Sequence, residues 1–145
     1  MVEAATSAQD TIRECKPEEK LSVIGLIERC GLGSDNEPGY VAEMLGRANR
    51  TIIVCERSGN VVGAVVVEED HHLHFGINYL VVDENHRNQK IAKKLMDEAE
   101  RQIRENGGRK IQLVVKNNDP AIIGFYERLG YEKDLGIPVL MRKYF

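Results

Sequence analysis

The sequence predicts one α/β domain, in which helices flank a mixed, mostly antiparallel sheet. One observation is the alternation of short β-type apolar runs with amphipathic helical patterns along the chain. The other is their order: a strand, two helices, three strands, a helix, a strand, a helix and two strands. The chain has 145 residues, enough for one core, and its 42% hydrophobic and 30% charged content is typical of globular proteins.

The first half of the chain is predicted to hold an edge strand and two helices. Residues 1–9 are small and polar and are expected to be disordered, so the domain spans 10–145. A strand is expected over Thr11–Cys15, and a helix starts at Pro17 and ends before Gly31. Its predicted buried face is Leu21, Ile24, Ile27 and Cys30. A second helix over Tyr40–Ala48 would point Val41, Met44 and Leu45 inward.

The rest of the chain is predicted to supply most of the sheet. Three strands are expected at 52–56, 61–67 and 73–82, with a hairpin turn at 57–60 that carries Gly and Asn. Another strand covers 110–115. Asp119 and Pro120 read as N-cap and first residue of a helix that runs to about Leu129. Two strands, 131–133 and 139–144, end the chain.

The stretch 79–96 predicts a phosphate site. An apolar strand passes through a polar turn into a helix whose buried face is Ile91, Leu95, Ala99 and Ile103. Opposite-charge pairs at i,i+4 mark its solvent face: Lys94/Glu98, Asp97/Arg101 and Glu100/Arg104. Unpaired amides and the positive dipole end of a helix suit an anion. Four cations surround this point, namely Arg87, Lys90, Lys93 and Lys94, which indicates a pyrophosphate.

Composition argues against several other functions. A formal net charge of -3 gives no reason to expect nucleic acid, and no apolar run approaches the roughly 20 residues that span a membrane. The N-terminus lacks the pattern of a secretory signal, so we expect a cytoplasmic protein. Cys15, Cys30 and Cys55 suggest neither disulfides nor a zinc knuckle. His71, His72 and His74 invite a metal hypothesis, since His72 and His74 would share one strand face. Two imidazoles without a third ligand make a poor metal site, so no metal is predicted.

Two motifs resemble the Gcn5-related N-acetyltransferase (GNAT) family. The family's signature Arg/Gln-x-x-Gly-x-Gly/Ala stands here as Arg87 to Ala92, with Lys90 in place of the first glycine. The second motif, Phe-Tyr-Glu-x-Leu-Gly-Tyr, occupies 125–131 and is the more specific. The order of elements is the family's as well. The last strand is similar to that of ribosomal-protein alanine acetyltransferases.

The resemblance implies an acetyl-CoA-dependent transfer to a primary amine, without a metal. Leu80, Val81 and Val82 would bind the pantetheine arm through their backbone, and Arg87 with the amides of Asn88, Gln89, Lys90, Ile91 and Ala92 would bind the pyrophosphate. Tyr126 would protonate the departing thiolate. Asn118 or Asp119 would contact the cofactor, or else cap the helix. Either the turn at Lys90 is right-handed and the lysine adds charge, or cofactor affinity is weakened.

Other points stay open at this stage. Some relatives carry a glutamate four residues before the pantetheine-binding triplet, where this chain has Gly76. The general base could therefore be Glu68, Glu69, His74 or a water chain. The acceptor pocket would be built from residues 17–50 and 134–138. The alternative function is a CoA-binding or interaction module without turnover, and the protein could be a monomer or a homodimer.

Overall fold

The computed structural model describes residues 10–31, 38–70, 73–115, 118–134 and 139–145. The predicted disordered segment 1–9 lies outside these residues, as do His71, His72 and most of the loop 134–138. Within the described residues, no helix has the length and apolar character needed to cross a membrane.

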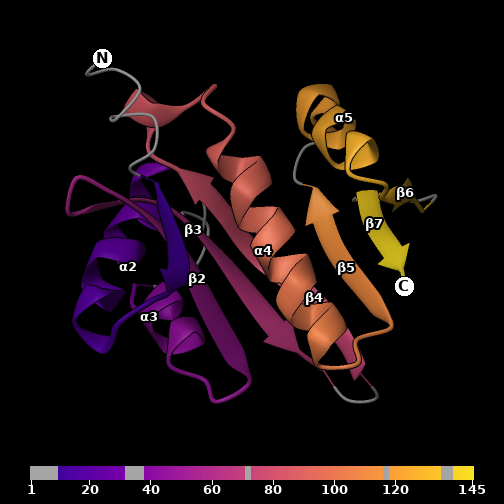
Figure 1. The fold of residues 1–145 in the computed structure, drawn as a ribbon, viewed down its shortest axis with the longest axis horizontal. Coiled ribbons are helices and arrows are strands. Elements are labelled where there is room, and N and C mark those ends of the chain that lie inside the picture. Colours follow the sequence, from indigo (N-terminus) through magenta and orange to yellow (C-terminus); the bar gives the residue numbers. More distant parts are fainter. Residues whose placement is uncertain (1–9, 32–37, 71–72, 116–117, 135–138) are drawn as a thin grey trace.

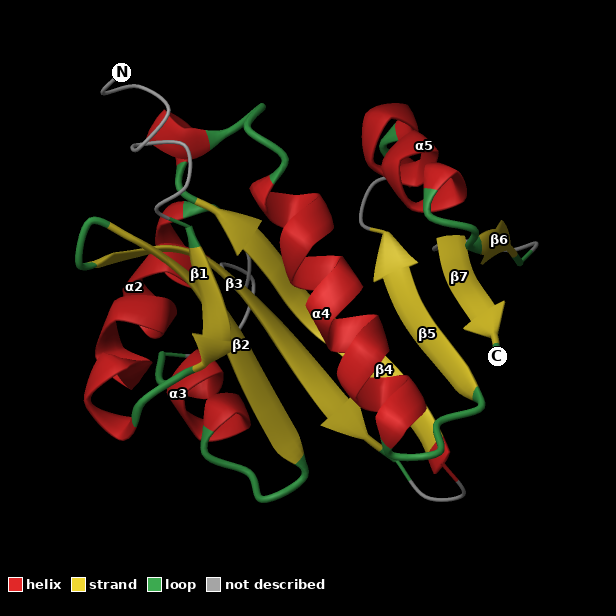
Figure 2. Cartoon of the chain, viewed as in Figure 1, coloured by secondary structure: helices red, strands yellow, loops and turns green. Residues whose placement is uncertain are grey.

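The described residues form a seven-stranded sheet in the order β1-β2-β3-β4-β5-β7-β6, with helices on both faces (Figures 1 and 2). The strands are β1 (Thr11–Glu14), β2 (Arg50–Arg57), β3 (Asn60–Glu69), β4 (His74–Val82), β5 (Lys110–Val115), β6 (Glu132–Lys133) and β7 (Val139–Tyr144). The helices are α2 (Lys20–Arg29), α3 (Tyr40–Leu45), α4 (Ile91–Glu105) and α5 (Pro120–Arg128), with short 3-10 turns η1 (Pro17–Glu19) and η3 (Glu84–His86). Neighbouring strands are antiparallel except β4 and β5. The predicted fold class is confirmed.

Helices α4 and α5 cover one face of the sheet. Strand side chains such as Ile53, Val65 and Ile111 pack there against Leu95 of α4 and Ile123 of α5. Burial of this apolar surface is the main stabilising contribution on this side of the sheet. The predicted buried stripe of α4 is confirmed, since Ile91, Leu95, Ala99 and Ile103 are all buried.

Helices α2 and α3 cover the opposite face over β2, β3 and β4. Val23, Leu26 and Ile27 of α2 and Val41 of α3 pack against strand residues such as Val66. The predicted face of α2 was wrong at Leu21, whose exposed fraction is 81%. Two overlapping apolar stripes of α2 could have faced the sheet: the predicted one, which includes Leu21, and the one that is buried, which includes Val23 and Leu26. The turn η1, which is anchored to β1 by two hydrogen bonds from Arg13 to Glu19, sets the rotation at which the helix starts. Helix α3 ends at Leu45, three residues earlier than predicted.

Strands β4 and β5 pair only at their beginnings. The pairs are His74 with Lys110, Phe75 with Ile111 and Gly76 with Gln112, and no further pair follows. Shortly after Gly76, β4 contains a bulge, because Tyr79 opposes Val66 while Ile77 opposes Val67, which leaves Asn78 as an extra residue. Bulges bend a strand and increase its twist. Among the described residues, the second half of β4 therefore pairs with β3 alone.

A buried carboxylate joins α4 to the C-terminal strands across this separation. Glu100, 6% exposed, accepts hydrogen bonds from the Tyr131 hydroxyl at 2.8 Å and from the Lys143 ammonium at 2.9 Å. Lys143 also donates to the carbonyl of Leu129 at the end of α5. The prediction that Glu100 lies on the solvent face of α4 is wrong, whereas its predicted pairing with Arg104 is present, with Nη1 3.6 Å from Oε1. A buried charge needs such partners, and they come from elements distant in sequence.

Candidate active site

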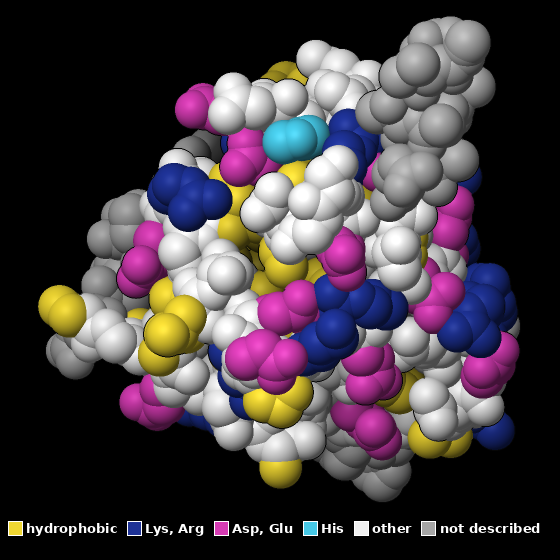
Figure 3. Space-filling model, turned by 60° about the vertical axis from the view of Figure 1, so that its left-hand side comes forward, with side chains coloured by type: hydrophobic (Ala, Val, Ile, Leu, Met, Phe, Trp, Pro, Cys, Tyr) yellow, Lys and Arg dark blue, Asp and Glu magenta, His cyan; other side chains and the backbone are white. Residues whose placement is uncertain are grey.

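A cavity with a volume of about 840 Å³ lies where β4, α4 and α5 meet. This is within the range of small-molecule and cofactor sites. Nine of the predicted site residues line it: Leu80, Val81, Val82, Arg87, Asn88, Lys90, Ile91, Ala92 and Tyr126. The sequence-predicted strand end, helix start and C-terminal tyrosine thus border one space. Charged side chains of both signs alternate over the face that Figure 3 shows, so no single-sign patch dominates it.

The start of α4 offers backbone groups to this cavity. Its N-cap, Lys90, has φ 65° and ψ 16°, and its side chain makes no capping hydrogen bond. The right-handed alternative for this turn is therefore wrong, because Lys90 adopts the left-handed conformation that glycine adopts without strain. The other alternative, a weakened affinity for the cofactor, stays a prediction. Asn88, with φ 64°, is left-handed as well, which asparagine tolerates better than most residues. The first amides of α4 are left for a ligand or solvent.

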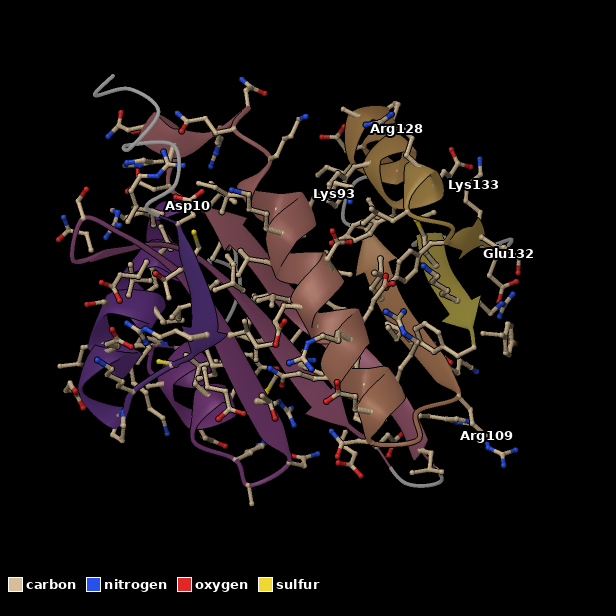
Figure 4. The ribbon with its side chains drawn as sticks, in the orientation of Figure 1. Asp10, Lys93, Arg109, Arg128, Glu132 and Lys133 are labelled. Atoms are coloured by element: carbon tan, nitrogen blue, oxygen red, sulfur yellow. The ribbon has the colours of Figure 1, made fainter. Side chains whose placement is uncertain are left out.

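The predicted ring of cations is partly engaged by protein groups. Arg87 donates from Nε to the carbonyl of Val82 at 3.2 Å and contacts Cys30 Sγ through Nη2 at 3.6 Å. Lys93 pairs with Asp97 at 2.8 Å, and its position on α4 faces α5 (Figure 4). Lys94 pairs with Asp10 rather than with the predicted Glu98. Lys90 and Arg87 are thus the cations with no carboxylate partner among the described residues around this turn.

Asp10, which lies just before β1 (Figure 4), links the start of α4 to the end of β2. Its carboxylate, 4% exposed, accepts hydrogen bonds from Arg57 at 2.6 and 2.9 Å and from Lys94 at 2.8 Å. The same guanidinium of Arg57 donates to Gln89 Oε1. The two cations lower the pKa of Asp10 to about 2, with the Arg57 hydrogen bond as the largest cause. Gln89 does not line the cavity, and its side chain serves this network instead.

Tyr126 is 7% exposed and lies on α5 between Phe125 and Tyr131. Its ring meets both neighbours edge to face, at centroid distances of 5.0 and 5.6 Å. Burial raises the pKa of Tyr126 well above the ordinary value for a phenol. The hydroxyl makes no hydrogen bond to another described residue, so the side chain is a protonated donor in the wall of the cavity.

Asp119 is a helix cap. Its carboxylate accepts a hydrogen bond from the amide of Ala121 at 2.9 Å, with Pro120 at the first helical position. The capping alternative is thereby confirmed. Neither Asp119 nor Asn118 lines the cavity, so a cofactor contact from either stays a prediction.

Lys93, one of the four predicted cations, also lines the cavity, and five further residues line it without having been predicted: Cys30, His86, Ala121, Ile122 and Phe125. Ile122 and Phe125 precede Tyr126 by four residues and one residue, so helical spacing could have placed them on or beside its face. Ile122 is 43% exposed, so much of this apolar side chain is accessible in the cavity wall. Cys30 comes from the end of α2, and nothing local in the sequence indicates its position.

The candidate general bases lie on β3 and β4, outside this lining. Glu69 and His74 are exposed. Glu68 is half-buried and accepts a hydrogen bond from Asn78 Nδ2 at 3.0 Å. In the part of the chain that the structure describes, no group of three or more His, Cys, Asp or Glu side chains is arranged to hold a metal ion.

Several solved structures share this fold. They include PaiA N-acetyltransferase from Thermoplasma acidophilum in complex with coenzyme A, with a TM-score of 0.76, 14% identity and coverage of 94% of this chain and 99% of that one. An aminoglycoside 6'-N-acetyltransferase complexed with coenzyme A has a TM-score of 0.76 and 17% identity, covering 92% and 96%. A GNAT acetyltransferase from Staphylococcus aureus has a TM-score of 0.78 and 16% identity, covering 93% and 98%.

The sequence model of the acetyltransferase (GNAT) family matches residues 16–131, which include the whole cavity lining. The separated strands, the uncapped start of α4 and Tyr126 on α5 all lie within this range. The chain therefore belongs to the GNAT acetyltransferase family.

Proposed function

We propose that this protein moves the acetyl group of acetyl-CoA to a primary amine by direct attack of the amine on the thioester. The observation that carries the proposal is the convergence of three features on one cavity: the unpaired edge of β4, the uncapped start of α4 and the phenol of Tyr126. Each suits a different part of acetyl-CoA.

The residues present fit coenzyme A. Its pyrophosphate is an anion, which the first amides of α4 would bind together with Lys90 and Arg87. Its pantetheine arm carries amides, which would pair with the backbone of Leu80, Val81 and Val82 where β4 has no strand on its β5 side. Ile122 and Phe125 supply apolar wall on the α5 side. In two of the neighbours described above, this fold binds coenzyme A.

The protein's own groups have separate parts in the transfer. A backbone amide of Leu80–Val82 would stabilise the negative charge that develops on the thioester oxygen. Tyr126 would donate its proton to the sulfur as the C–S bond breaks, and its raised pKa keeps it protonated at neutral pH. The amine attacks the acetyl carbon directly, so no residue of the protein carries the acetyl group.

The test compares the wild type with Tyr126→Phe, which keeps the ring and removes the proton donor. We expect thiol release with the best amine of a broad panel to fall by about 10²–10⁴, the usual range for one general acid. Calorimetric affinity for acetyl-CoA should be unchanged, because the phenol acts as the bond breaks. Tyr144→Phe is the matched control, since Tyr144 is 61% exposed and outside the cavity.

Three outcomes would contradict parts of the proposal. Absence of binding heat at millimolar acetyl-CoA would show that acetyl-CoA is not the co-substrate. Binding without turnover over the whole panel would favour the alternative, a CoA-binding module. Equal turnover in wild type and Tyr126→Phe would remove Tyr126 from the chemistry while leaving the transfer itself in place.

A further inference from the structure

The sheet contains a carboxylate at the point where β4 leaves β5. Glu68 on β3 is the cross-strand partner of Gly76, and Gly76 with Gln112 is the last pair that joins β4 to β5. A Cβ atom built on Gly76 would lie 4.0 Å from Glu68 Oε1. The carboxylate of β3 therefore occupies the space beside Gly76 that a longer side chain on β4 would fill.

The bulge in β4 fixes this carboxylate. Asn78, the extra residue of the bulge, donates from Nδ2 to Glu68 Oε1 at 3.0 Å. On the other side Arg50 Nη1 lies 3.5 Å from Glu68 Oε2, and the Arg50 side chain is only 2% exposed. Glu68 itself is 34% exposed. The carboxylate is thus held by two neighbouring strands and still reached by solvent.

Two polar atoms of this cluster lack partners. Asn78 Oδ1 and Arg50 Nε are buried and make no hydrogen bond in the described structure. Buried polar atoms are nearly always satisfied, so unpaired ones point to a water molecule or a ligand. Asn78 Oδ1 can only accept, and it belongs to the residue that holds the Glu68 carboxylate. Asn78 Oδ1 and the Glu68 carboxylate are acceptors, which suit a water or a protonated amine, whereas Arg50 Nε is a donor, which suits the oxygen of a water.

The cluster lies on the face opposite the helices that border the cavity. Glu68 follows Ala64 and Val66 at two-residue spacing, and those two pack under α2 and α3. Helices α4 and α5 cover the other face (Figure 2). Glu68 therefore lies on the α3 side of the separated strands, opposite α4 and α5.

We propose that Glu68, fixed by Asn78 and Arg50, takes the proton from the incoming ammonium group through a bridging water. The acceptor is accordingly a cationic primary amine. This inference rests on the proposed acetyl transfer. A water is needed because Glu68 does not line the cavity, and one water is an accepted link between a base and its proton.

The protons balance over the reaction. The ammonium gives one proton through the water to Glu68, and the free amine pair forms the C–N bond. As the C–S bond breaks, the nitrogen releases a second proton to solvent and Tyr126 donates one to the sulfur. Glu68 then loses its proton to solvent and Tyr126 regains one, so a single proton leaves overall.

The experiment measures kcat/KM against pH for the wild type and Glu68→Gln. At neutral pH the variant should be slower by about 10² or more. The deficit should shrink as pH approaches the pKa of the acceptor amine, because the free base needs no proton acceptor. The charged and titratable groups on or near this face include Arg50, Tyr79 and, from α3, Tyr40. His74 and Lys110 lie where β4 pairs with β5, with Arg142 and Tyr144 beside them on β7. All of these groups are present in both proteins. Glu69→Gln, next along the strand, is the matched control with no deficit.

A rescue variant separates chemistry from folding. Glu68→Gln combined with Gly76→Glu returns a carboxylate from the facing strand, and Gly76 has room, since its nearest neighbour beyond the strand is the Gln112 carbonyl at 3.7 Å. We expect at least tenfold recovery of kcat/KM at neutral pH. A deficit that is constant with pH and is not rescued would overturn the inference, as would unchanged turnover in Glu68→Gln. A wild type that acetylates no amine would overturn the proposed function as well.

Discussion

The two helices that border the cavity begin in different ways. Helix α5 starts with Asp119 bonded to the Ala121 amide and Pro120 at the first position, so its end is satisfied locally. Helix α4 starts at a left-handed Lys90 without a side-chain cap. Its support comes from Asp10, which lies outside the helix and bonds Lys94 and Arg57. Helix α5 thus contributes side chains such as Tyr126 to the cavity, whereas α4 contributes the backbone amides of its uncapped N-terminus.

The difference follows from what each helix is proposed to do. A capped N-terminus has part of its amide capacity already used, so α5 acts through Tyr126, two turns further on. An uncapped N-terminus keeps its amides for an anion, but its conformation must then be fixed by tertiary contacts. Stability at the start of α4 is accordingly expected to depend on residues distant in sequence.

The largest expected effect on stability is that of Asp10→Asn. The pKa of Asp10 is lowered from 3.8 to about 2 by Arg57 and Lys94, which corresponds to about 2 kcal/mol of stabilisation at neutral pH. Because the folded pKa is the lower one, this contribution is present above about pH 4 and is lost as pH falls toward 2. Urea unfolding at several pH values should show the gap between wild type and variant closing over that window. A gap independent of pH would contradict the ion-pair explanation.

A smaller effect is expected for Asp119→Ala, which removes the cap of α5. The loss of one capping hydrogen bond should lower the free energy of unfolding by about 1 kcal/mol. Acetyl-CoA affinity, measured by calorimetry, should stay the same, because Asp119 does not line the cavity. A clear loss of affinity would restore the predicted cofactor contact. A loss of stability larger than that of Asp10→Asn would contradict the inference that the start of α4 depends more on tertiary contacts than the start of α5 depends on its local cap.

The smallest effect, and one of opposite sign, is expected for Lys90→Gly. Relief of the left-handed conformation should stabilise the fold by about 1 kcal/mol, partly offset by the greater freedom of glycine in the unfolded chain. Affinity for acetyl-CoA should change little, while its dependence on salt becomes flatter, since one screened charge near the proposed phosphate site is lost. Calorimetric titration with acetyl-CoA at two salt concentrations measures both the affinity and its dependence on salt. A tenfold gain in affinity would mean that Lys90 obstructs the site.

Much of the fold could be predicted because its signals are local. The predicted hairpin turn at 57–60 joins β2 to β3, with positive φ at Ser58 and Gly59, and Asp119 caps the helix that it was expected to start. The wrong predictions concern residues with competing partners. Lys94 could pair with Glu98 or with Asp10, and helix spacing shows only the first possibility. Leu21 belongs to an apolar stripe as good as the one that was buried.

The sequence by itself determined the order of strands and helices, the N-cap of α5 and the two motifs that carry the family resemblance, because turn chemistry and periodicity act over a few residues. The tertiary structure decided the conformation of Lys90, the separation of β4 from β5, the burial of Glu100 and the pairing of Glu68 with Gly76. These depend on register between strands and on contacts between residues far apart in the chain. Such contacts form only when the whole core packs, which no local pattern encodes.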